Sequence, residues 1–381
     1  MGVLDYDVAV IGGGVVGAAA AHRAAGSGAA TLLVDRRDVG RATDAGAGII
    51  APAISRARGP VRDLGDVAGA RYAALVDELH RHGRSDVGFA RTGLLAVCVD
   101  DDEQWLFDRW FDEVERRRRR VGHPTGHTVE RLEPDEARSR YPVLGHVSGA
   151  FFDSGAARVD GRLLDDALLT AATGAGAELS GGSVSGLVLD GSTVGVVVDG
   201  VRRTARSVVI AGGAWSDAFA EQLGVTIPVA PQRGQIIHLQ VTGREAQTGG
   251  WPVLSPLGDE YHVAWPGGRV AVGATRETGS GFDPRATVAG VRKMLDVAVA
   301  VAPGLADAEL VEVRIGLRPL SADGVPVLGR VPGASGVVVA TGHGPLGLTL
   351  GPLSGQIAAD LALGMAADLD IEPFAVDRFG R

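Results

Sequence analysis

Apolar runs interrupted by glycines recur along this chain. Residues 6–13, YDVAVIGG, form a continuous apolar run of the kind required by a strand buried on both faces of a parallel sheet. An alanine-rich stretch that begins at Val15 predicts a helix, and residues 30–37, ATLLVDRR, predict a second strand. Similar apolar runs that lead into glycines occur at residues 206–216 and 336–364. The pattern therefore predicts an α/β unit with a parallel sheet.

Further segments alternate between apolar and polar positions, which is typical of strands with one buried face. Residues 261–277 predict two such strands joined by Pro-Gly-Gly, and residues 229–241 predict a strand of the same sheet. Residues 309–317 predict another strand, which Pro319 is expected to close. The alternation indicates a second sheet beside the α/β unit.

Two long segments, residues 101–120 and 283–303, have the apolar spacing of amphipathic helices. We expect Asp283 to cap the second helix and Pro303 to end it. The first helix ends in ERRRRR, residues 115–120, which is the one strongly basic run. We interpret this run as the solvated end of a helix, with contact to lipid or a polyanion as the alternative.

Length and composition place the chain among soluble enzymes. Its 381 residues exceed the size at which a single core usually stops growing, so we expect two intertwined domains. The 57 glycines lack a collagen-like period and indicate many tight turns or close backbone contacts. The net charge of -9 gives no electrostatic basis for binding nucleic acid, so no nucleic-acid partner is expected.

The single cysteine limits the chemistry further, because it allows neither an internal disulfide nor a cysteine-built metal site. Cys98 lies in an apolar alternating run and is interpreted as a buried small hydrophobe rather than a catalytic thiol. No metal is expected. The start of the chain lacks a basic signal region, and the apolar residues 8–21 are too few and too rich in glycine to span a bilayer. We expect a cytoplasmic protein; peripheral membrane contact is possible but not indicated.

The first strand and helix carry a nucleotide-binding pattern. Gly12, Gly14 and Gly17 fit G-x-G-x-x-G, in which the first glycine permits a tight turn and the second admits a pyrophosphate. The third glycine lets the helix from Val15 pack closely on the strand, and the helix N-terminus offers N–H groups to phosphate. Asp35 ends the second strand, where an acid binds ribose hydroxyls. Together these features predict a bound dinucleotide.

The other glycine-ended segments distinguish FAD from NAD. FAD is the longer cofactor and is typically held by early, middle and late parts of a chain, which fits residues 8–37, 206–216 and 336–364. A second complete G-x-G-x-x-G unit for a nicotinamide partner is missing from the sequence. The sequence therefore favours bound FAD that is reduced by an organic substrate rather than by NAD(P)H.

Seven motifs, spread over nearly the whole chain, carry a resemblance to a known family. They are VIGGGVVGAAAAHRAA, GRATDAGAGIIAP, VVIAGGAWS, PVAPQRGQI, YHVAWPGGRVAVGAT, GLRPLSADGVPVLG and TGHGPLGLTLGP. In order and spacing the chain resembles the D-amino-acid oxidase superfamily of FAD-dependent oxidoreductases, which includes glycine oxidases, D-amino-acid dehydrogenases and sarcosine oxidases. These motifs are specific for the superfamily and say little about the substrate.

The resemblance implies a fold and a division into domains. The expected fold is a Rossmann-like FAD-binding domain of the glutathione-reductase type, with an inserted α+β substrate domain that contains a large, mostly antiparallel sheet. The FAD-binding domain would be discontinuous, at residues 1–80, 150–225 and 320–381. The substrate-binding domain would take residues 81–149 and 226–319.

The resemblance also implies cofactor contacts. Residues 43–48 resemble a segment that runs beside the flavin, and Val184 resembles a residue whose backbone meets the adenine. The chain has neither a C-terminal cysteine nor a histidine in residues 43–48, so a non-covalent flavin is expected. The full set of expected cofactor-binding residues is Gly12, Gly14, Val15, Val16, Gly17, Asp35, Arg36, Arg37, Thr43, Ala45, Gly46, Ala47, Gly48, Val184, Ala211, Gly212, Trp215, Gly342, Gly344, Leu346, Gly347, Leu348 and Thr349.

Oxidation of an amino acid requires a group that holds the carboxylate, and an arginine fork is the natural holder. Arg318 matches the carboxylate-binding arginine of the family and could be aimed into a cavity by the strand before it. Arg314 is the nearest competitor for this role, because it lies four residues before Arg318 and would project from the same face of the strand. A surface arginine in a turn is the alternative interpretation of Arg318.

The predicted strand that begins at Tyr261 contains two aromatic residues and a histidine. In the family, a tyrosine at the position of Tyr261 donates its hydroxyl to the substrate carboxylate; a tyrosine packed on a sheet is the alternative. His262 follows it and is expected on the opposite face. Trp265 lines either the pocket or the core.

A glycine-rich loop precedes the last predicted helix. Gly342, Gly344 and Gly347 would form a loop whose N–H groups face the pyrimidine edge of the flavin, followed by a helix from about Ser354. His343 lies in this loop and is a candidate for a direct role beside the ring, though not as a general base.

The expected function is FAD-dependent oxidation of the C–N bond of a small amino acid, of the D-amino-acid or glycine type. A hydride would pass from Cα to flavin N5, and the resulting imine would hydrolyse to an oxo acid and an amine. Oxidation of secondary amines such as sarcosine or proline-like compounds is the first alternative, and a non-catalytic flavoprotein is the second. The sequence leaves open the amino acid, its enantiomer, dioxygen or a quinone as acceptor, and the oligomeric state.

Overall fold

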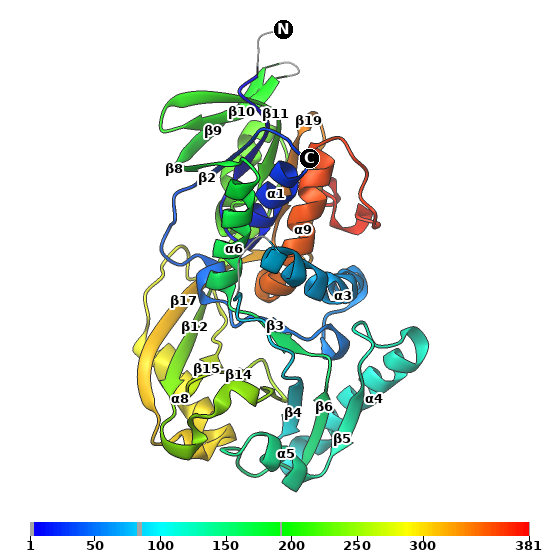
Figure 1. Ribbon diagram of the computed structural model, residues 1–381, viewed down its shortest axis with the longest axis vertical. Helices are drawn as coiled ribbons and strands as arrows, with labels where there is room; N and C mark the ends of the chain where they lie inside the picture. Colours follow the sequence, from blue (N-terminus) through cyan, green and yellow to red (C-terminus); the bar gives the residue numbers. More distant parts are fainter. Residues whose placement is uncertain (1–3, 82–85, 191–192, 381) are drawn as a thin grey trace.

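Two large β-sheets dominate the computed structural model, which describes residues 4–81, 86–190 and 193–380 (Figure 1). The strands of the first sheet are β1 (Tyr6–Ile11), β2 (Thr31–Asp35), β8 (Glu178–Gly181), β9 (Val184–Asp190), β10 (Thr193–Val198), β11 (Val201–Ile210), β18 (Val327–Val331) and β19 (Ala334–Thr341). The strands of the second sheet are β4 (Leu94–Cys98), β5 (Val129–Leu132), β6 (Gly149–Asp153), β12 (Val229–Gln240), β13 (Val253–Pro256), β14 (Tyr261–Trp265), β15 (Arg269–Gly273), β16 (Glu277–Thr278) and β17 (Glu309–Ser321). The short strands β3 (Ile49–Ile50) and β7 (Ala157–Arg158) pair with each other.

Helices cover both sheets. The α-helices are α1 (Val15–Gly26), α2 (Ala42–Ala45), α3 (Gly59–Arg81), α4 (Gln104–Val121), α5 (Pro134–Arg140), α6 (Gly161–Gly174), α7 (Ala220–Leu223), α8 (Val288–Val301) and α9 (Gly347–Ala362). Short 3₁₀ helices are η1 (Pro52–Ile54), η2 (Asp101–Glu103), η3 (Gly213–Phe219), η4 (Gly243–Ala246), η5 (Thr248–Gly250), η6 (Pro303–Leu305), η7 (Gly344–Leu346), η8 (Glu372–Phe374) and η9 (Val376–Phe379).

The first sheet contains the predicted parallel unit. Its strand order is β18-β19-β11-β1-β2-β8, with β10 beside β11 and β9 beside β10. The strand β1 pairs in parallel with β2 and β11, so that Val8 lies opposite Thr31 on one side and Ser207 on the other. Val8 and Val10 are fully buried, as a strand covered on both faces requires. The α/β prediction for this part of the chain is confirmed.

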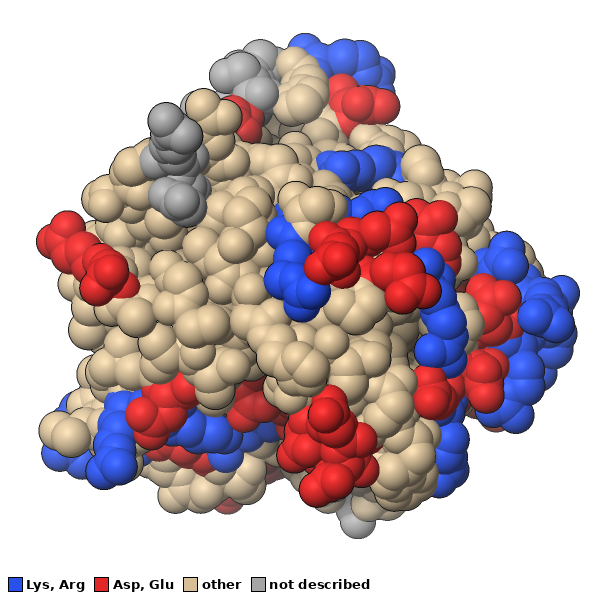
Figure 2. Space-filling model, turned by 90° about the horizontal axis from the view of Figure 1, so that it is seen from below, with Lys and Arg blue, Asp and Glu red and all other residues tan. Residues whose placement is uncertain are grey.

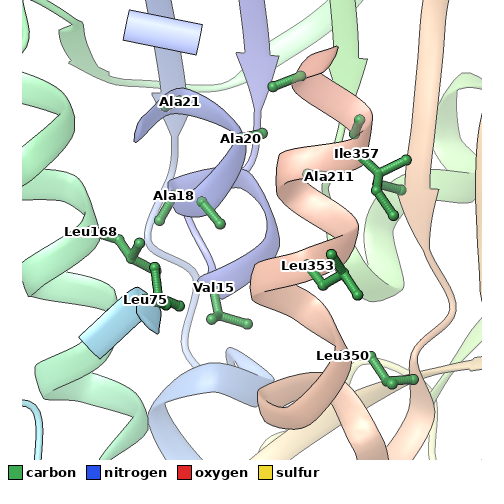
Figure 3. Packing of buried hydrophobic residues seen from close by; sticks show 14 of the residues in the cluster. Val15, Ala18, Ala20, Ala21, Leu75, Leu168, Ala211, Leu350, Leu353 and Ile357 are labelled. Carbon is green, nitrogen blue, oxygen red and sulfur yellow. The ribbon is translucent and has the colours of Figure 1, made fainter. Parts of the chain in front are cut away.

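Helix α1 packs on this sheet between three other helices. Figure 3 shows Val15 and Ala18 of α1 close to Leu353 of α9, Leu168 of α6 and Leu75 of α3, all in one buried cluster. Alanines make up much of α1, and their small side chains let the neighbouring helices approach closely. The packing fixes the N-terminus of α1 at the carboxyl end of β1.

The second sheet is mostly antiparallel, as expected. Its order is β16-β12-β15-β14-β13-β4-β6-β5, with β17 beside β12. The long β12–β17 ladder runs from Val229 opposite Ser321 to Gln240 opposite Glu309. The pair β4–β13 is parallel, whereas the other strand pairs recorded in this sheet are antiparallel. Cys98 is fully buried at the end of β4, which agrees with its interpretation as a core residue.

The last helix begins earlier than predicted. Helix α9 starts at Gly347 rather than near Ser354, and it contains Pro352. Proline has no N–H to donate to the carbonyl four residues before it, which belongs to Leu348. The hydroxyl of Tyr72 donates to that carbonyl instead, at 2.9 Å. The hydrogen bond from Tyr72 of α3 therefore allows α9 to continue beyond Pro352.

Two other boundaries also differ from the predictions. Strand β17 does not close at Pro319, because Pro319 lies opposite Pro231 in the ladder and the strand continues to Ser321. Helix α8 is capped by Thr287, whose hydroxyl accepts from the N–H of Gly290 at 3.1 Å. Asp283 is not the cap.

The arginine run on α4 is only partly solvated. Arg117 is 9% exposed and donates to the carbonyls of Pro52 and Ala53 at 3.0 and 3.1 Å. It also pairs with Asp66 of α3. Arg119 and Arg120 are exposed, as predicted. Arg117 therefore links α4 to η1 and to α3.

The surface around the second sheet mixes both signs of charge. Viewed from that end, acidic and basic side chains lie beside one another over much of the rim (Figure 2). None of the helices within residues 4–81, 86–190 and 193–380 has an apolar stretch that could cross a bilayer.

Candidate active site

A cavity of about 830 Å³ extends from the carboxyl ends of β1 and β2 to strands β14 and β17 of the second sheet. The carboxyl edge of a parallel sheet is where α/β folds bind ligands. The cavity therefore connects a predicted nucleotide site to the predicted substrate residues.

The glycine loop at the end of β1 is shaped for a pyrophosphate. Gly12 has φ 97°, and a Cβ there would meet the carbonyl of Ala211. A Cβ on Gly17 would overlap the carbonyl oxygen of Gly12, so only glycine allows this contact between helix and loop. Gly14 is the N-cap of α1 and provides no side-chain cap, so the helix end is open to phosphate apart from the N–H of Val15. Thr43 accepts from the N–H of Val15 at 3.1 Å.

Asp35 lies at the end of β2, beside this loop. A Cβ on Gly13 would touch its carboxylate, and both residues line the cavity. An acid at this place suits ribose hydroxyls. Glycine cradle, free helix end and carboxylate together fit a dinucleotide.

A buried ion pair, which sequence reasoning missed, supports the loop. Arg41 donates to the carbonyl of Gly13 at 2.6 Å and to Asp165 of α6 at 2.8 Å, and Asp35 lies 3.6 Å away. Burial raises the pKa of Asp165 to about 7, against the opposing effect of Arg41. Arg41 lies inside a recognised motif, but nothing local marks Asp165 as its partner.

Most of the predicted cofactor residues line the cavity. At one end lie Arg36 and Val184, next to Gly182 and Ser183. The lining includes Gly12, Gly14, Val15, Val16, Asp35, Arg36, Thr43, Ala45, Gly46, Ala47, Gly48, Val184, Ala211, Gly212, Trp215, Gly344, Leu346, Gly347, Leu348 and Thr349.

Three predicted residues do not line it. Gly17 packs behind the loop, as described above. Arg37 turns away after β2 with φ 56°, and its N–H donates to Asp35 at 3.2 Å. Gly342 has φ 76° and lies against Ser321. Gly17 and Gly342 shape the backbone around the cavity. Because none of the three residues lines the cavity, their contact with the cofactor stays a prediction.

The segment of small residues at the end of α2 forms a thin wall. Ala45, Gly46 and Ala47 line the main cavity on one side and a second cavity of about 30 Å³ on the other. Arg314 and Trp265 line the second cavity and are absent from the lining of the first. Arg314 is also held by Glu312, at 3.0 Å. The competing arginine is thus separated from the main cavity.

Arg318 and Tyr261 meet in the main cavity. Arg318 projects from β17 and donates to the carbonyl of Thr275 at 3.0 Å, and the Tyr261 hydroxyl lies near enough to interact with it electrostatically. Burial lowers the pKa of Arg318 and raises the pKa of Tyr261. No carboxylate of the described residues forms an ion pair with Arg318, although Asp259 acts on it electrostatically. The pair offers a guanidinium and a hydroxyl to an acid group. His262 is fully buried behind them and contacts Tyr141, on the opposite face as predicted.

His343 also lines the cavity, just before η7 and α9. It is 4% exposed, and its Nε2 has no hydrogen-bond partner within the described part of the chain. Burial lowers its pKa to about 4, so the ring is neutral at pH 7. The N-terminal residues of α9 face the cavity beside it, with the positive end of the helix dipole.

Sequence reasoning missed several side chains at this end of the cavity. They come from α4 and from the loops after η1, before β14 and after β15, and are Arg56, Trp110, Asp259 and Arg276. Arg56 and Arg276 are 220 positions apart in the sequence, so no local spacing signals the assembly of these residues.

Comparisons with known proteins agree with this site. The model of the family described as DAO, FAD dependent oxidoreductase, matches residues 7–361. The chain is 38% identical to the uncharacterized oxidoreductase YurR of Bacillus subtilis strain 168, over 96% of this chain and 97% of that protein. It is 31% identical to glycine oxidase of Geobacillus kaustophilus strain HTA426, over 98% of this chain and 97% of the relative.

Solved structures are similar over the same length. Iminodiacetate oxidase of Chelativorans sp. BNC1 superposes with a TM-score of 0.92 at 37% identity, covering 97% of this chain and 98% of that one. The structure of glycine oxidase from Geobacillus kaustophilus gives a TM-score of 0.87 at 29% identity, with 98% of each chain covered.

Proposed function

This chain belongs to the DAO family of FAD-dependent oxidoreductases, and we propose that it oxidises the C–N bond of a small amino acid of the glycine or D-amino-acid type. The imine formed would then be hydrolysed to an oxo acid and an amine. The enzyme class and the use of FAD follow from the family; the substrate is the proposal.

One observation supports the substrate class most strongly. The guanidinium of Arg318 and the hydroxyl of Tyr261 converge in the cavity, and Arg318 has no carboxylate partner among the described residues. A guanidinium fork is the group best suited to a carboxylate, and hydrogen bonds to charged groups each contribute about 1.5–3 kcal/mol. The pair would therefore hold the substrate by its acid group.

The residues around the glycine loop would hold the cofactor. The end of α1 would receive the pyrophosphate, Asp35 the ribose, and Val184 would lie at the adenine. Residues 43–48 and the start of α9 would lie beside the flavin. We further propose that the first sheet belongs to a cofactor domain at residues 1–80, 150–225 and 320–381, and most of the second to a substrate domain at 81–149 and 226–319. Strand β6 (Gly149–Asp153) of the second sheet lies across one of these boundaries.

When bound, FAD supplies an acceptor for the hydride that leaves the carbon bearing the amine. Arg318 and Tyr261 orient that carbon by fixing the neighbouring carboxylate, and orientation alone can lower a barrier by about 7–11 kcal/mol. His343 provides a neutral, buried ring that excludes water without adding charge. The N–H groups at the start of α9 stabilise negative charge in the cavity.

Anaerobic titration of the purified holoenzyme tests the proposal. Glycine, D-alanine or another small amino acid is expected to bleach the visible absorbance of the bound flavin. If no carboxylate-bearing amine bleaches it, the proposed substrate class is wrong. Electrons would pass on to dioxygen or a quinone, and comparing oxygen uptake with reduction of a quinone analogue separates these acceptors.

Secondary amines are the second candidate. The observation in their favour is the likeness to iminodiacetate oxidase, whose name specifies a substrate with nitrogen between two carbons. Comparing the rate of flavin bleaching by sarcosine and proline with that by glycine and D-alanine distinguishes the two candidates.

A further inference from the structure

The guanidiniums of Arg56 and Arg276 line the cavity at the end that holds Arg318, and both contact the loop at residues 258–259. Arg56 donates to the carbonyl of Gly258 at 2.6 Å. Arg276 lies 3.0 Å from the carboxylate of Asp259, measured from its Nε. Neighbouring residues of one loop, Gly258 and Asp259, therefore position two cations that come from distant parts of the chain.

The Arg276 backbone directly follows the anchor of Arg318. The carbonyl of Thr275 accepts from the Arg318 guanidinium at 3.0 Å, and Arg276 is the next residue. Its charge adds to the effect of burial in lowering the pKa of Arg318 and opposes the rise that burial causes in the pKa of Tyr261, which agrees with its place in the same corner of the cavity. An acid held by Arg318 would thus lie near a second positive group.

Arg56 is fixed in orientation as well as in position. Its guanidinium lies 4.2 Å from the ring centre of Trp110, which projects from α4 into the cavity wall. Trp110 in turn donates to the carbonyl of Ile54 at 3.3 Å. Stacking on an aromatic ring leaves the edges of a guanidinium free for hydrogen bonds.

The charges at this end do not balance with a single acid. Arg56, Arg276 and Arg318 provide three positive charges and Asp259 provides one negative charge. Arg58 and Arg62 also line the cavity, and Arg62 pairs with Glu113 at 2.9 Å. One substrate carboxylate would leave at least one cation without a counterpart, and a second carboxylate would reduce this excess. The other nearby carboxylate, Glu260, pairs with Lys293 at 3.0 Å.

Arg276 also has donors to spare. Its side chain is 38% exposed, and its η nitrogens donate no hydrogen bond to any residue in the described ranges. Asp259 is 61% exposed, so it is a weak, solvated competitor for the same guanidinium. An anion entering the cavity could therefore share Arg276 with Asp259.

We propose that Arg276, assisted by Arg56, forms a second anion-binding subsite, so that the substrate is a small amine or amino acid with two carboxylates. Arg318 and Tyr261 hold the carboxylate next to the reacting carbon, and Arg276 holds the other one. The second acid is attached either to that carbon or to the amine nitrogen. The inference rests on the proposed function of Arg318, and it adds the class of substrate.

Binding of two ether analogues to the holoenzyme tests the subsite without turnover. Oxydiacetate has two carboxylates and methoxyacetate has one, and neither contains an amine to oxidise. Their dissociation constants are measured from the change that each causes in the flavin absorbance spectrum. We expect oxydiacetate to bind at least about tenfold more tightly, the value of one charge-assisted contact.

Substitutions at the subsite should change this ratio in opposite directions. Arg276→Gln is expected to bring the ratio of the two dissociation constants close to one, and Asp259→Asn to increase it by freeing Arg276. Arg292→Gln is the matched control, because Arg292 is 81% exposed on α8 and should keep the ratio.

The outcomes separate this inference from the proposed function. Equal binding of the two ethers, or a ratio that survives Arg276→Gln, would overturn the subsite. If Arg276→Gln does not fold, a ratio unchanged in Asp259→Asn would overturn it as well. Failure of the proposed function is visible elsewhere, as a flavin that no amino acid bleaches although the ethers bind.

Discussion

The guanidinium of Arg318 occupies the space that a side chain on Gly234 would fill. Gly234 is in β12, two residues after Gln232, which pairs with Arg318 of the neighbouring strand β17. A Cβ built on Gly234 would overlap three atoms of the guanidinium. The backbone of the neighbouring strand, rather than a carboxylate, thus sets the place of this cation.

Gly234→Ala should therefore displace Arg318 and weaken substrate binding. We expect kcat/KM to fall by about tenfold or more, because the guanidinium would lose its alignment with the carboxylate. Gly181→Ala is the control, since a Cβ on that strand residue meets nothing within 4 Å. Steady-state kinetics that are the same for both variants would refute the role assigned to this contact.

Tyr261→Phe removes the hydroxyl that meets Arg318 and leaves the ring in place. The expected result is a KM for the amino acid raised by about tenfold, with the flavin content retained. Tyr6→Phe serves for comparison, because the Tyr6 hydroxyl donates to Glu178 at the surface, at 2.7 Å. An unchanged KM in Tyr261→Phe would mean that Tyr261 is only a packing residue.

Two glycines of α1 provide a test of the nucleotide loop. A Cβ on Gly17 would overlap the carbonyl oxygen of Gly12, whereas one on Gly26 meets nothing within 4 Å. Gly17→Ala should lower the free energy of unfolding by about 1–3 kcal/mol and reduce the FAD content of the purified protein. Gly26→Ala should leave both unchanged or raise stability by up to about 1 kcal/mol. Denaturant unfolding and absorbance spectra measure the two quantities.

Acid should destabilise the fold through buried histidines. Burial lowers the pKa of His262 from 6.5 to about 3, so the native state holds a neutral ring while the unfolded chain binds a proton below pH 6.5. The stability contributed by this group is complete above pH 6.5 and is lost as the pH falls toward 3, by about 2 kcal/mol at pH 5. His238 and His343, with pKa values lowered to about 4, act in the same direction.

His262→Gln should flatten this dependence. The difference in the free energy of unfolding between pH 7 and pH 5 is expected to shrink by about 2 kcal/mol relative to the parent protein. The parent protein, measured under the same conditions, provides the comparison. Equal slopes for the parent protein and His262→Gln would show that His262 is not held neutral in the native state.

The sequence was sufficient for the parts of the fold that depend on local constraints. The strand, glycine loop, helix and Asp35 follow one another within thirty residues, and each glycine has a steric reason that acts over a short distance. The alternation in β14 and β15 likewise predicted two paired strands and the turn between them.

Features that depend on distant partners could not be predicted. Helix α9 passes through Pro352 because Tyr72 on another helix satisfies a freed carbonyl. Arg117 turns inward because Asp66 and two carbonyls lie beneath it. Arg56 and Arg276 both contact the loop at residues 258–259, which is distant in sequence from Arg56.

The substrate-binding role of Arg318 is the central claim, and one measurement tests it most directly. Anaerobic titration with the amino acid that bleaches the parent enzyme is repeated on Arg318→Gln and Arg314→Gln, each first shown to retain FAD. We expect Arg318→Gln to require about a hundredfold more amino acid for half-bleaching, and Arg314→Gln to titrate like the parent. Half-bleaching of Arg318→Gln at the parent concentration would contradict the account.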